Sequence, residues 1–172
     1  RGRVLFDGQE YAGYLATRIV QTLNDGFSID PLCRLLERLQ KNPDPRVRDQ
    51  LFQWLEACNM PITPIGTFLA YKYVREDLKS SHDGKTQHVI GEVLSMPRED
   101  CDPDPNQTCS RGLHFAGWDY VAGSGPVKLV LELAPEGVVG VPVDSASQKA
   151  RACRYVPIAR AGPARAPATH LR

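Results

Sequence analysis

The chain has 172 residues, a formal net charge of +1 and 42% hydrophobic residues. These values are typical of a globular protein with one good core or two small ones, and they exclude a strong bulk attraction to nucleic acid. The longest apolar runs, Lys128 to Ala134 and Val138 to Val143, are far too short to span a membrane. Because the first residue is Arg1, we expect that the sequence is part of a longer chain.

The N-terminal third predicts a short strand followed by three amphipathic helices. Residues 1–8 predict a strand that ends in an Asp-Gly turn, and apolar residues three and four apart predict a helix over 9–25 with Gly26 as its C-cap. A second helix is predicted from Ser28 or Asp30 to Asn42-Pro43, and a third begins after Asp44, which caps it. We expect these helices to form a subdomain over residues 1–60.

Beyond Pro61 and Pro64 the pattern changes to short strands, and we expect about five or six of them in a mostly antiparallel sheet. The predicted strands are 67–74, 87–94, 113–115, 128–134, 138–143 and 154–158, with His88 on the surface of the second. The predicted fold class is α+β: the helical subdomain packs on a β-rich domain over 61–159. A long loop over 97–112 decorates this domain, and residues 160–172 are predicted to be a disordered tail.

Several polar side chains of the β-rich half are candidates for a ligand or partner patch. They are Lys72, Asp104, Cys109, His114, Lys149, Arg154 and Tyr155. Lysine, arginine and histidine together suit a phosphate or carboxylate ligand, and an enzyme would bring Lys72, His114 and Tyr155 into one concave site. In the alternative, Lys72 points to solvent while Tyr71 and Tyr73 pack inward. No Gly-rich phosphate loop accompanies the patch.

The cysteines leave two chemical alternatives open. Cys101, Cys109, His114 and Cys153 could gather around zinc, although they lack the close Cys-x-x-Cys pair that is typical of zinc sites. Cys109 could instead be a nucleophile that His114 activates. An odd number of cysteines, five, favours a reduced intracellular protein, and Cys33 and Cys58 are predicted to be small buried residues of the helices. We therefore expect no metal and no cofactor.

Four segments together resemble a known family. They are NDGFSIDPLCRLLERLQKNP (24–43), PITPIGTFLAYKYVRED (61–77), GEVLSMPREDCDPDPNQTCSRGLHFAG (91–117) and VVGVPVDSASQKARACRYVPI (138–158). These segments resemble the C-terminal region of the rIIB rapid-lysis proteins of tailed phages. The resemblance covers residues 2–158 and excludes the tail rich in alanine, proline and arginine.

The resemblance implies a phage accessory protein in the cytoplasm of the infected bacterium. Such a protein delays lysis and overrides exclusion by resident prophages through protein–protein contacts. The resemblance also implies an rIIA-like partner near the inner face of the membrane, and a second copy of the chain is the other partner that we consider. It implies no reaction and no catalytic residue. Two further functions stay open: an enzyme or nucleotide or phosphate binder that uses Lys72, His114 and Arg154, and a virion structural component.

Overall fold

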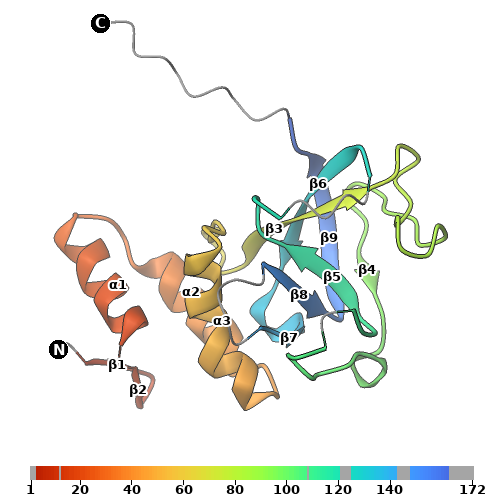
Figure 1. Cartoon of the computed structure of the whole chain (residues 1–172). Helices are drawn as coiled ribbons and strands as arrows, with labels where there is room; N and C mark the ends of the chain where they lie inside the picture. Colours follow the sequence, from red (N-terminus) through yellow and green to blue (C-terminus); the bar gives the residue numbers. More distant parts are fainter. Residues whose placement is uncertain (1–2, 12, 108, 121–124, 143–147, 163–172) are drawn as a thin grey trace, which may run out of the picture.

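The computed structural model of the chain describes residues 3–11, 13–107, 109–120, 125–142 and 148–162. Within these residues it has three α-helices, a two-stranded hairpin and a seven-stranded antiparallel sheet (Figure 1). The helices precede the large sheet in the sequence, so the predicted α+β fold is confirmed. Most of the predicted disordered tail, residues 163–172, lies outside the described residues.

The chain begins with a hairpin of β1 (Val4–Phe6) and β2 (Gln9–Tyr11). Its turn residues Asp7 and Gly8 have φ angles of 47° and 75°, as a two-residue hairpin turn of the I′ type requires. The prediction of a helix from residue 9 was therefore wrong for its first turn. The turn sends the chain back as a strand, and the helix α1 begins only at Tyr14.

Helix α1 (Tyr14–Asn24) has Asp25 as its C-cap, and the glycine that the sequence predicted as the cap is the next residue. Gly26 has a φ angle of 78° and donates to the carbonyl of Leu23, while the N–H of Phe27 reaches back to the carbonyl of Thr22. These two bonds form a Schellman motif, which satisfies carbonyls at the helix end.

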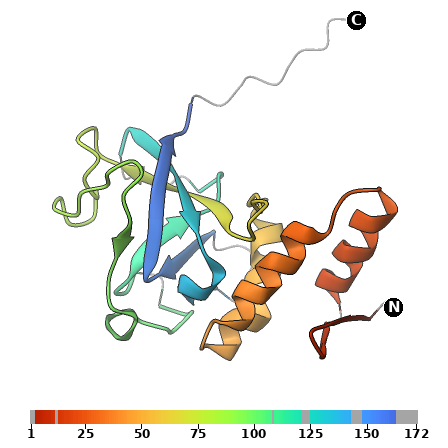
Figure 2. The ribbon, with the colours of Figure 1, turned by 180° about the vertical axis from the view of Figure 1, so that it is seen from behind.

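Helices α2 (Asp30–Gln40) and α3 (Pro45–Ala57) form as the sequence predicted. The side chain of Asp44 accepts a hydrogen bond from the N–H of Arg46 at 2.9 Å and so caps α3. The predicted apolar stripe of α2 is buried, and it consists of Leu32, Leu35, Leu36 and Leu39. Both α2 and α3 lie between α1 and the sheet, which leaves α1 outermost (Figure 2).

The large sheet has the strand order β4-β9-β6-β3-β5-β8-β7. Its strands are β3 (Phe68–Val74), β4 (Leu94–Ser95), β5 (Leu113–Ala116), β6 (Val127–Leu133), β7 (Val138–Gly140), β8 (Lys149–Ala152) and β9 (Arg154–Arg160). The central pair β3 and β6 is in register along the whole of β3, from Phe68 opposite Leu133 to Val74 opposite Val127. Short 3₁₀ turns lie at Arg98–Asp100, between β4 and β5, and at Pro135–Gly137, between β6 and β7.

Two predictions about the strands were wrong. The strand predicted over 87–94 is mostly a loop, and its last residue begins the two-residue strand β4. The strand β8 lies where the sequence suggested only a connection, because its four residues, KARA, carry no alternation of large apolar side chains. It pairs with β5 over its full length, from Leu113 opposite Ala152 to Ala116 opposite Lys149.

Helices and strands contribute to one buried cluster. The ring of Phe115 on β5 lies 5.7 Å from that of Trp54 on α3 and 5.8 Å from that of Phe68 on β3. The buried amide of Asn42 donates to the carbonyls of Pro135 and Val138, at 2.9 Å and 2.8 Å. The region that links α2 to α3 is therefore fixed to the sheet by a polar contact as well as by apolar packing. No helix in the described ranges is long and apolar enough to cross a membrane.

Candidate functional site

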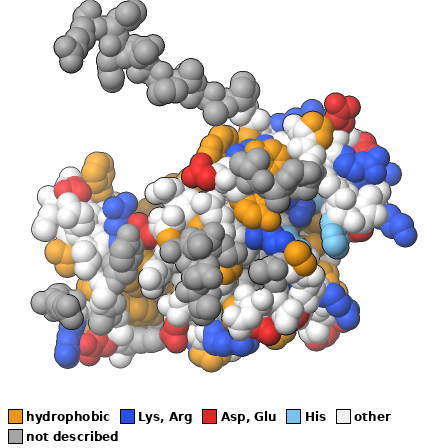
Figure 3. All heavy atoms as spheres, viewed as in Figure 1, with side chains coloured by type: hydrophobic (Ala, Val, Ile, Leu, Met, Phe, Trp, Pro, Cys, Tyr) orange, Lys and Arg blue, Asp and Glu red, His pale blue; other side chains and the backbone are white. Residues whose placement is uncertain are grey.

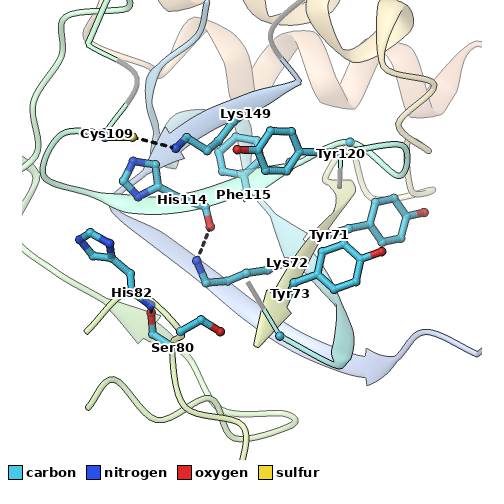
Figure 4. A pocket seen from close by; sticks show the side chains of 14 residues that line it. Tyr71, Lys72, Tyr73, Ser80, His82, Cys109, His114, Phe115, Tyr120 and Lys149 are labelled. Atoms are coloured by element: carbon cyan, nitrogen blue, oxygen red, sulfur yellow. Dashed lines mark hydrogen bonds between the residues drawn. The ribbon is translucent and has the colours of Figure 1, made fainter. Parts of the chain in front are cut away.

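A cavity opens where two strands of the sheet separate. Strands β3 and β5 pair at one position, Tyr71 opposite Ala116, and then diverge. The cavity has a volume of about 670 Å³ and is bordered by β3, β5, β8 and the turn over 80–82 (Figure 4). Its described lining residues are Tyr71, Lys72, Tyr73, Ser80, Ser81, His82, Cys109, His114, Phe115, Ala116, Gly117, Tyr120, Gly125 and Lys149. A volume of this size is within the range of small-molecule sites, about 300–1,000 Å³.

Lys72 points from the core face of β3. Side chains alternate along a strand, so Lys72 shares its face with the buried side chains of Phe68, Ala70 and Val74. Its Nζ donates to the backbone carbonyl of His114 at 3.1 Å, which gives that carbonyl a donor where the strands have diverged. The alternative in which Lys72 points to solvent while Tyr71 and Tyr73 pack inward is therefore wrong, because Lys72 is on the core face of β3. Burial, helped by the charge of Lys149, lowers the pKa of Lys72 to about 8, although Asp83 opposes the shift.

The imidazole of His114 enters the cavity from β5, next to Lys72. Its Nε2 atom is buried and has no hydrogen-bond partner among the described residues. Burial, together with the charges of Lys149, Lys72, Arg151 and His82, lowers the pKa of His114 to about 4. The imidazole is therefore neutral near pH 7, and its buried Nε2 has an unused capacity for a hydrogen bond.

Lys149 and Cys109 also line the cavity, near Lys72 and His114. Lys149 lies opposite Ala116 in the β5–β8 ladder, and its Nζ donates to the sulfur of Cys109 at 3.6 Å. Figure 4 shows the side chains of Lys72, His82, His114 and Lys149 around one end of the cavity, the rings of Tyr71 and Tyr73 at the other, and Tyr120 beside Lys149. The cavity thus has a basic end and an aromatic end.

A third lysine nearby is fully engaged. The Nζ of Lys128 donates to the carbonyl of Trp118 at 2.6 Å and lies 3.5 Å from the centroid of the Trp118 ring. It also lies 5.2 Å from the ring of Tyr73 and 5.6 Å from that of Tyr71, so cation–π contacts hold these side chains. Tyr71 and Tyr73 are consequently fixed as a wall of the cavity.

Three predicted site residues lie elsewhere. Asp104 is in the long loop, where its carboxylate accepts from the N–H of Asn106, and Arg154 is exposed on β9. Tyr155 is buried, with its hydroxyl 2.8 Å from Nε2 of His88. The structure therefore brings together Lys72, Cys109, His114 and Lys149 of the predicted patch, and not the other three.

His88 was predicted at the surface, and that prediction was wrong: its side chain is 1% exposed. Its Nδ1 lies 3.1 Å from the carbonyl of Leu78, which assigns the proton to Nδ1 and makes Nε2 the acceptor for the Tyr155 hydroxyl. This buried pair holds the loop over 78–88 against β9. His88 was predicted at the surface because it was placed on a strand over 87–94, whereas it belongs to a loop whose buried contact is made by one side chain.

Sequence reasoning missed the residue that organises the long loop. Arg151 on β8 is 3% exposed, and its Nε donates to the carbonyl of Asp102 at 3.0 Å. The rest of its guanidinium donates to the carbonyls of Asp104 and Gln107. Three carbonyls of the predicted loop over 97–112 are thus gathered on one buried cation. Only the register of β8 shows this, because nothing in the spacing of Arg151 points to the loop.

The zinc alternative is not supported by the geometry. Cys101 is buried, and its sulfur contacts the carbonyls of Pro97 and Ala152, whereas Cys109 lies beside Lys149. Among the residues that the structure describes, no three histidine, cysteine or acidic side chains are placed to hold a metal ion.

We expect acid to destabilise the protein through His114. In the unfolded chain its pKa is 6.5, and in the folded protein about 4, so the unfolded chain binds more protons between these values. The free energy of unfolding should therefore fall by roughly 2 kcal/mol as the pH drops from 6.5 towards 4. Urea unfolding of wild type and of His114→Gln at several pH values measures this. A variant as acid-sensitive as wild type would show that other groups are responsible.

The structure defines an α+β protein with a single-sheet core, three packed helices and a cavity that has a basic and an aromatic end. The family model described as Bacteriophage T4 protein rIIB matches residues 1–169. Protein rIIB of Enterobacteria phage T4 is 32% identical over 157 residues, which cover 90% of this chain and 50% of that protein. The chain belongs to the rIIB family, as the four sequence segments indicated, and it spans about half the length of this curated relative. No solved structure matches the chain.

Proposed function

We propose that the chain acts in the infected bacterium as an rIIB-like accessory protein. It delays lysis or overrides prophage exclusion by binding another protein. Membership of the rIIB family supports the setting. The observation that carries the proposed mode of action is an exposed apolar stripe on the outermost helix.

The apolar stripe consists of Val20, Leu23 and Phe27, whose side chains are 43%, 53% and 71% exposed. Val20 and Leu23 are three residues apart on α1, and Phe27 lies just beyond the helix, where its backbone N–H donates to the carbonyl of Thr22 in the Schellman motif. Leu15 and Ile19 of α1 are buried, and Leu23 follows Ile19 by four residues on the same face, so the exposed side chains continue the apolar face of α1 beyond the part that the fold covers. Figure 3 shows hydrophobic side chains exposed at the helical end of the molecule. Exposed apolar side chains grouped near one another are typical of a protein interface.

We take an rIIA-like protein of the same phage as the occupant of the stripe. Through such a partner the chain would work in the host cytoplasm, at the inner face of the membrane. A second copy of the chain would compete for the same surface. Light scattering of the chain alone and mixed with the rIIA-like protein distinguishes these two occupants. A virion structural component would instead remain with purified phage particles.

Replacing Phe27 by aspartate in the full-length protein should shorten the time to lysis of an infected culture to that of a phage without the gene. A charge in the middle of an apolar interface costs affinity because it must be desolvated. Gln53→Asp introduces the same charge at an exposed position of α3 and should leave lysis time at the wild-type value. Circular dichroism establishes that both variants are folded. Normal lysis timing with Phe27→Asp would overturn the proposed role of the stripe.

A further inference from the structure

We propose that the cavity between β3, β5 and β8 is a binding site for a nucleoside monophosphate. Lys72, His114 and Lys149 hold the phosphate, and the tyrosine rings at the other end of the cavity contact the base. The site is separate from the apolar stripe and does not depend on the proposed function.

The basic end provides donors that the fold leaves available. An ammonium group has three N–H donors, and the carbonyl of His114 accepts one of those of Lys72. Lys149 reaches the same end from β8 (Figure 4). Two ammonium groups brought together at least partly out of water repel each other, and a phosphate between them replaces that repulsion with charge-assisted hydrogen bonds.

The buried Nε2 of His114 is the second, independent indication of a ligand. Buried polar atoms are nearly always hydrogen-bonded, and one without a partner costs free energy. The neutral imidazole can present an N–H at this nitrogen, and a phosphate oxygen between Lys72 and Lys149 would accept it.

No carboxylate is present among the described residues that line the cavity. The carboxylate that acts on the charge of Lys72 is that of Asp83, which raises its pKa. This carboxylate already accepts hydrogen bonds from the backbone of Lys85 and from the backbone and hydroxyl of Thr86. The basic end therefore lacks an internal counterion of its own, and it selects an anion.

The aromatic end favours a ligand that is more than a bare anion. Tyr71, Tyr73, Phe115 and Tyr120 are the aromatic residues of the described lining. Aromatic rings stack well on nucleobases, and Ser80 and Ser81 are also lining residues, which offer hydroxyls to a ribose. Because the cavity volume is about 670 Å³, a mononucleotide fits and a folded polynucleotide segment does not.

Binding should weaken at alkaline pH. The phosphate monoester keeps its charge above about pH 7, whereas the pKa of Lys72 in the free protein is about 8. Above this value binding requires uptake of a proton, so the dissociation constant should rise about tenfold per pH unit. The charged and titratable groups that face Lys72 and its neighbours are Lys149, Asp83, His82, His88 and His114.

The test is isothermal titration calorimetry of the purified chain with AMP, adenosine and inorganic phosphate, and with Lys72→Met, Lys149→Met and Lys41→Met. We expect AMP to bind at least tenfold more tightly than adenosine or phosphate alone. Each cavity variant should weaken AMP binding by about tenfold or more, which is the effect of one charge-assisted hydrogen bond. Lys41 is exposed at the end of α2, so its replacement removes the same charge outside the cavity and should have no effect.

Three results of the titrations with AMP and adenosine would overturn the proposal. They are the absence of AMP binding at millimolar concentration, equal affinities for AMP and adenosine, and AMP binding that both cavity variants retain.

If inorganic phosphate binds as tightly as AMP, the site is an anion site without a base subsite, and the assignment to a nucleotide is wrong. Titration with vesicles that contain phosphatidic acid tests whether the phosphate belongs to a lipid headgroup. Tighter binding to these vesicles than to AMP would also overturn the proposal.

Discussion

Replacing Lys72 by methionine should make the protein more stable at pH 7, by about 1 to 3 kcal/mol. The charged form of Lys72 is disfavoured on the core face of β3, beside the buried Ala70 and Val74, and its pKa falls from 10.5 to about 8. At pH 7 the folded protein carries the full cost of this buried ammonium. Methionine has a similar length and no charge, and its only loss is the hydrogen bond to the carbonyl of His114.

The pH dependence has a definite sign. Between about pH 8 and 10.5 the folded protein has released the Lys72 proton while the unfolded chain still holds it, so the free energy of unfolding should rise with pH. Urea unfolding at several pH values from 7 to 10.5 measures this rise, which Lys72→Met should lack. Lys41→Met shows the contribution of all other groups. A Lys72→Met protein that is less stable than wild type at pH 7 would mean that the ammonium is well solvated.

Replacing Arg151 by methionine should destabilise the protein by about 3 kcal/mol and release the loop over 101–107. The guanidinium is buried and donates to the carbonyls of Asp102, Asp104 and Gln107. Without it these carbonyls lose their donors, and the loop must detach from β8 to reach water. Hydrogen exchange of the loop amides should then become fast while that of the β3–β6 pair stays slow.

Arg111→Met is the matched control for Arg151→Met. Arg111 follows the same loop, its side chain is exposed, and its ion pair with Asp100 is long at 3.7 Å. An exposed pair of this kind contributes little, so stability should change by less than about 1 kcal/mol. Equal effects of the two substitutions, or a loop that stays protected in Arg151→Met, would contradict the assigned role of Arg151.

The buried guanidinium and the buried ammonium differ in what they contribute. Arg151 is satisfied by the fold itself, so its burial is structural. The ammonium of Lys72 is buried where its charge costs free energy. It lies near Nε2 of His114, which has no hydrogen-bond partner among the described residues. A protein keeps a destabilising buried charge most readily where a bound ligand of opposite charge offsets it. The expected gain in stability of Lys72→Met is therefore what the proposed anion site implies.

The helices could be predicted from the sequence because local signals determine them. The leucines of α2, the cap at Asp44 and the glycine at position 26 act within a few residues of chain. The strands were less accessible. The short strand β8 has no pattern of its own and forms because β5 lies beside it, and the loop over 78–88 is ordered by the distant Tyr155.

The candidate site shows the same limit. Residue types alone identified Lys72, His114 and Lys149 as suited to an anion, and the structure places them around one cavity. Sequence could not show that β3 and β5 diverge after a single pair, which is what opens the cavity. It also could not exclude Arg154 and Tyr155, because the face on which each lies depends on the register of β9 with β4 and β6.

Multi-angle light scattering of the purified full-length protein, alone and mixed with the rIIA-like protein of the same phage, tests most directly whether the chain works by binding a partner. We predict a complex heavier than either protein that Phe27→Asp abolishes and Gln53→Asp preserves. A heavier species without the rIIA-like protein that Phe27→Asp dissociates would show a second copy as the occupant of the stripe. Two separate proteins that do not associate when mixed would contradict the account.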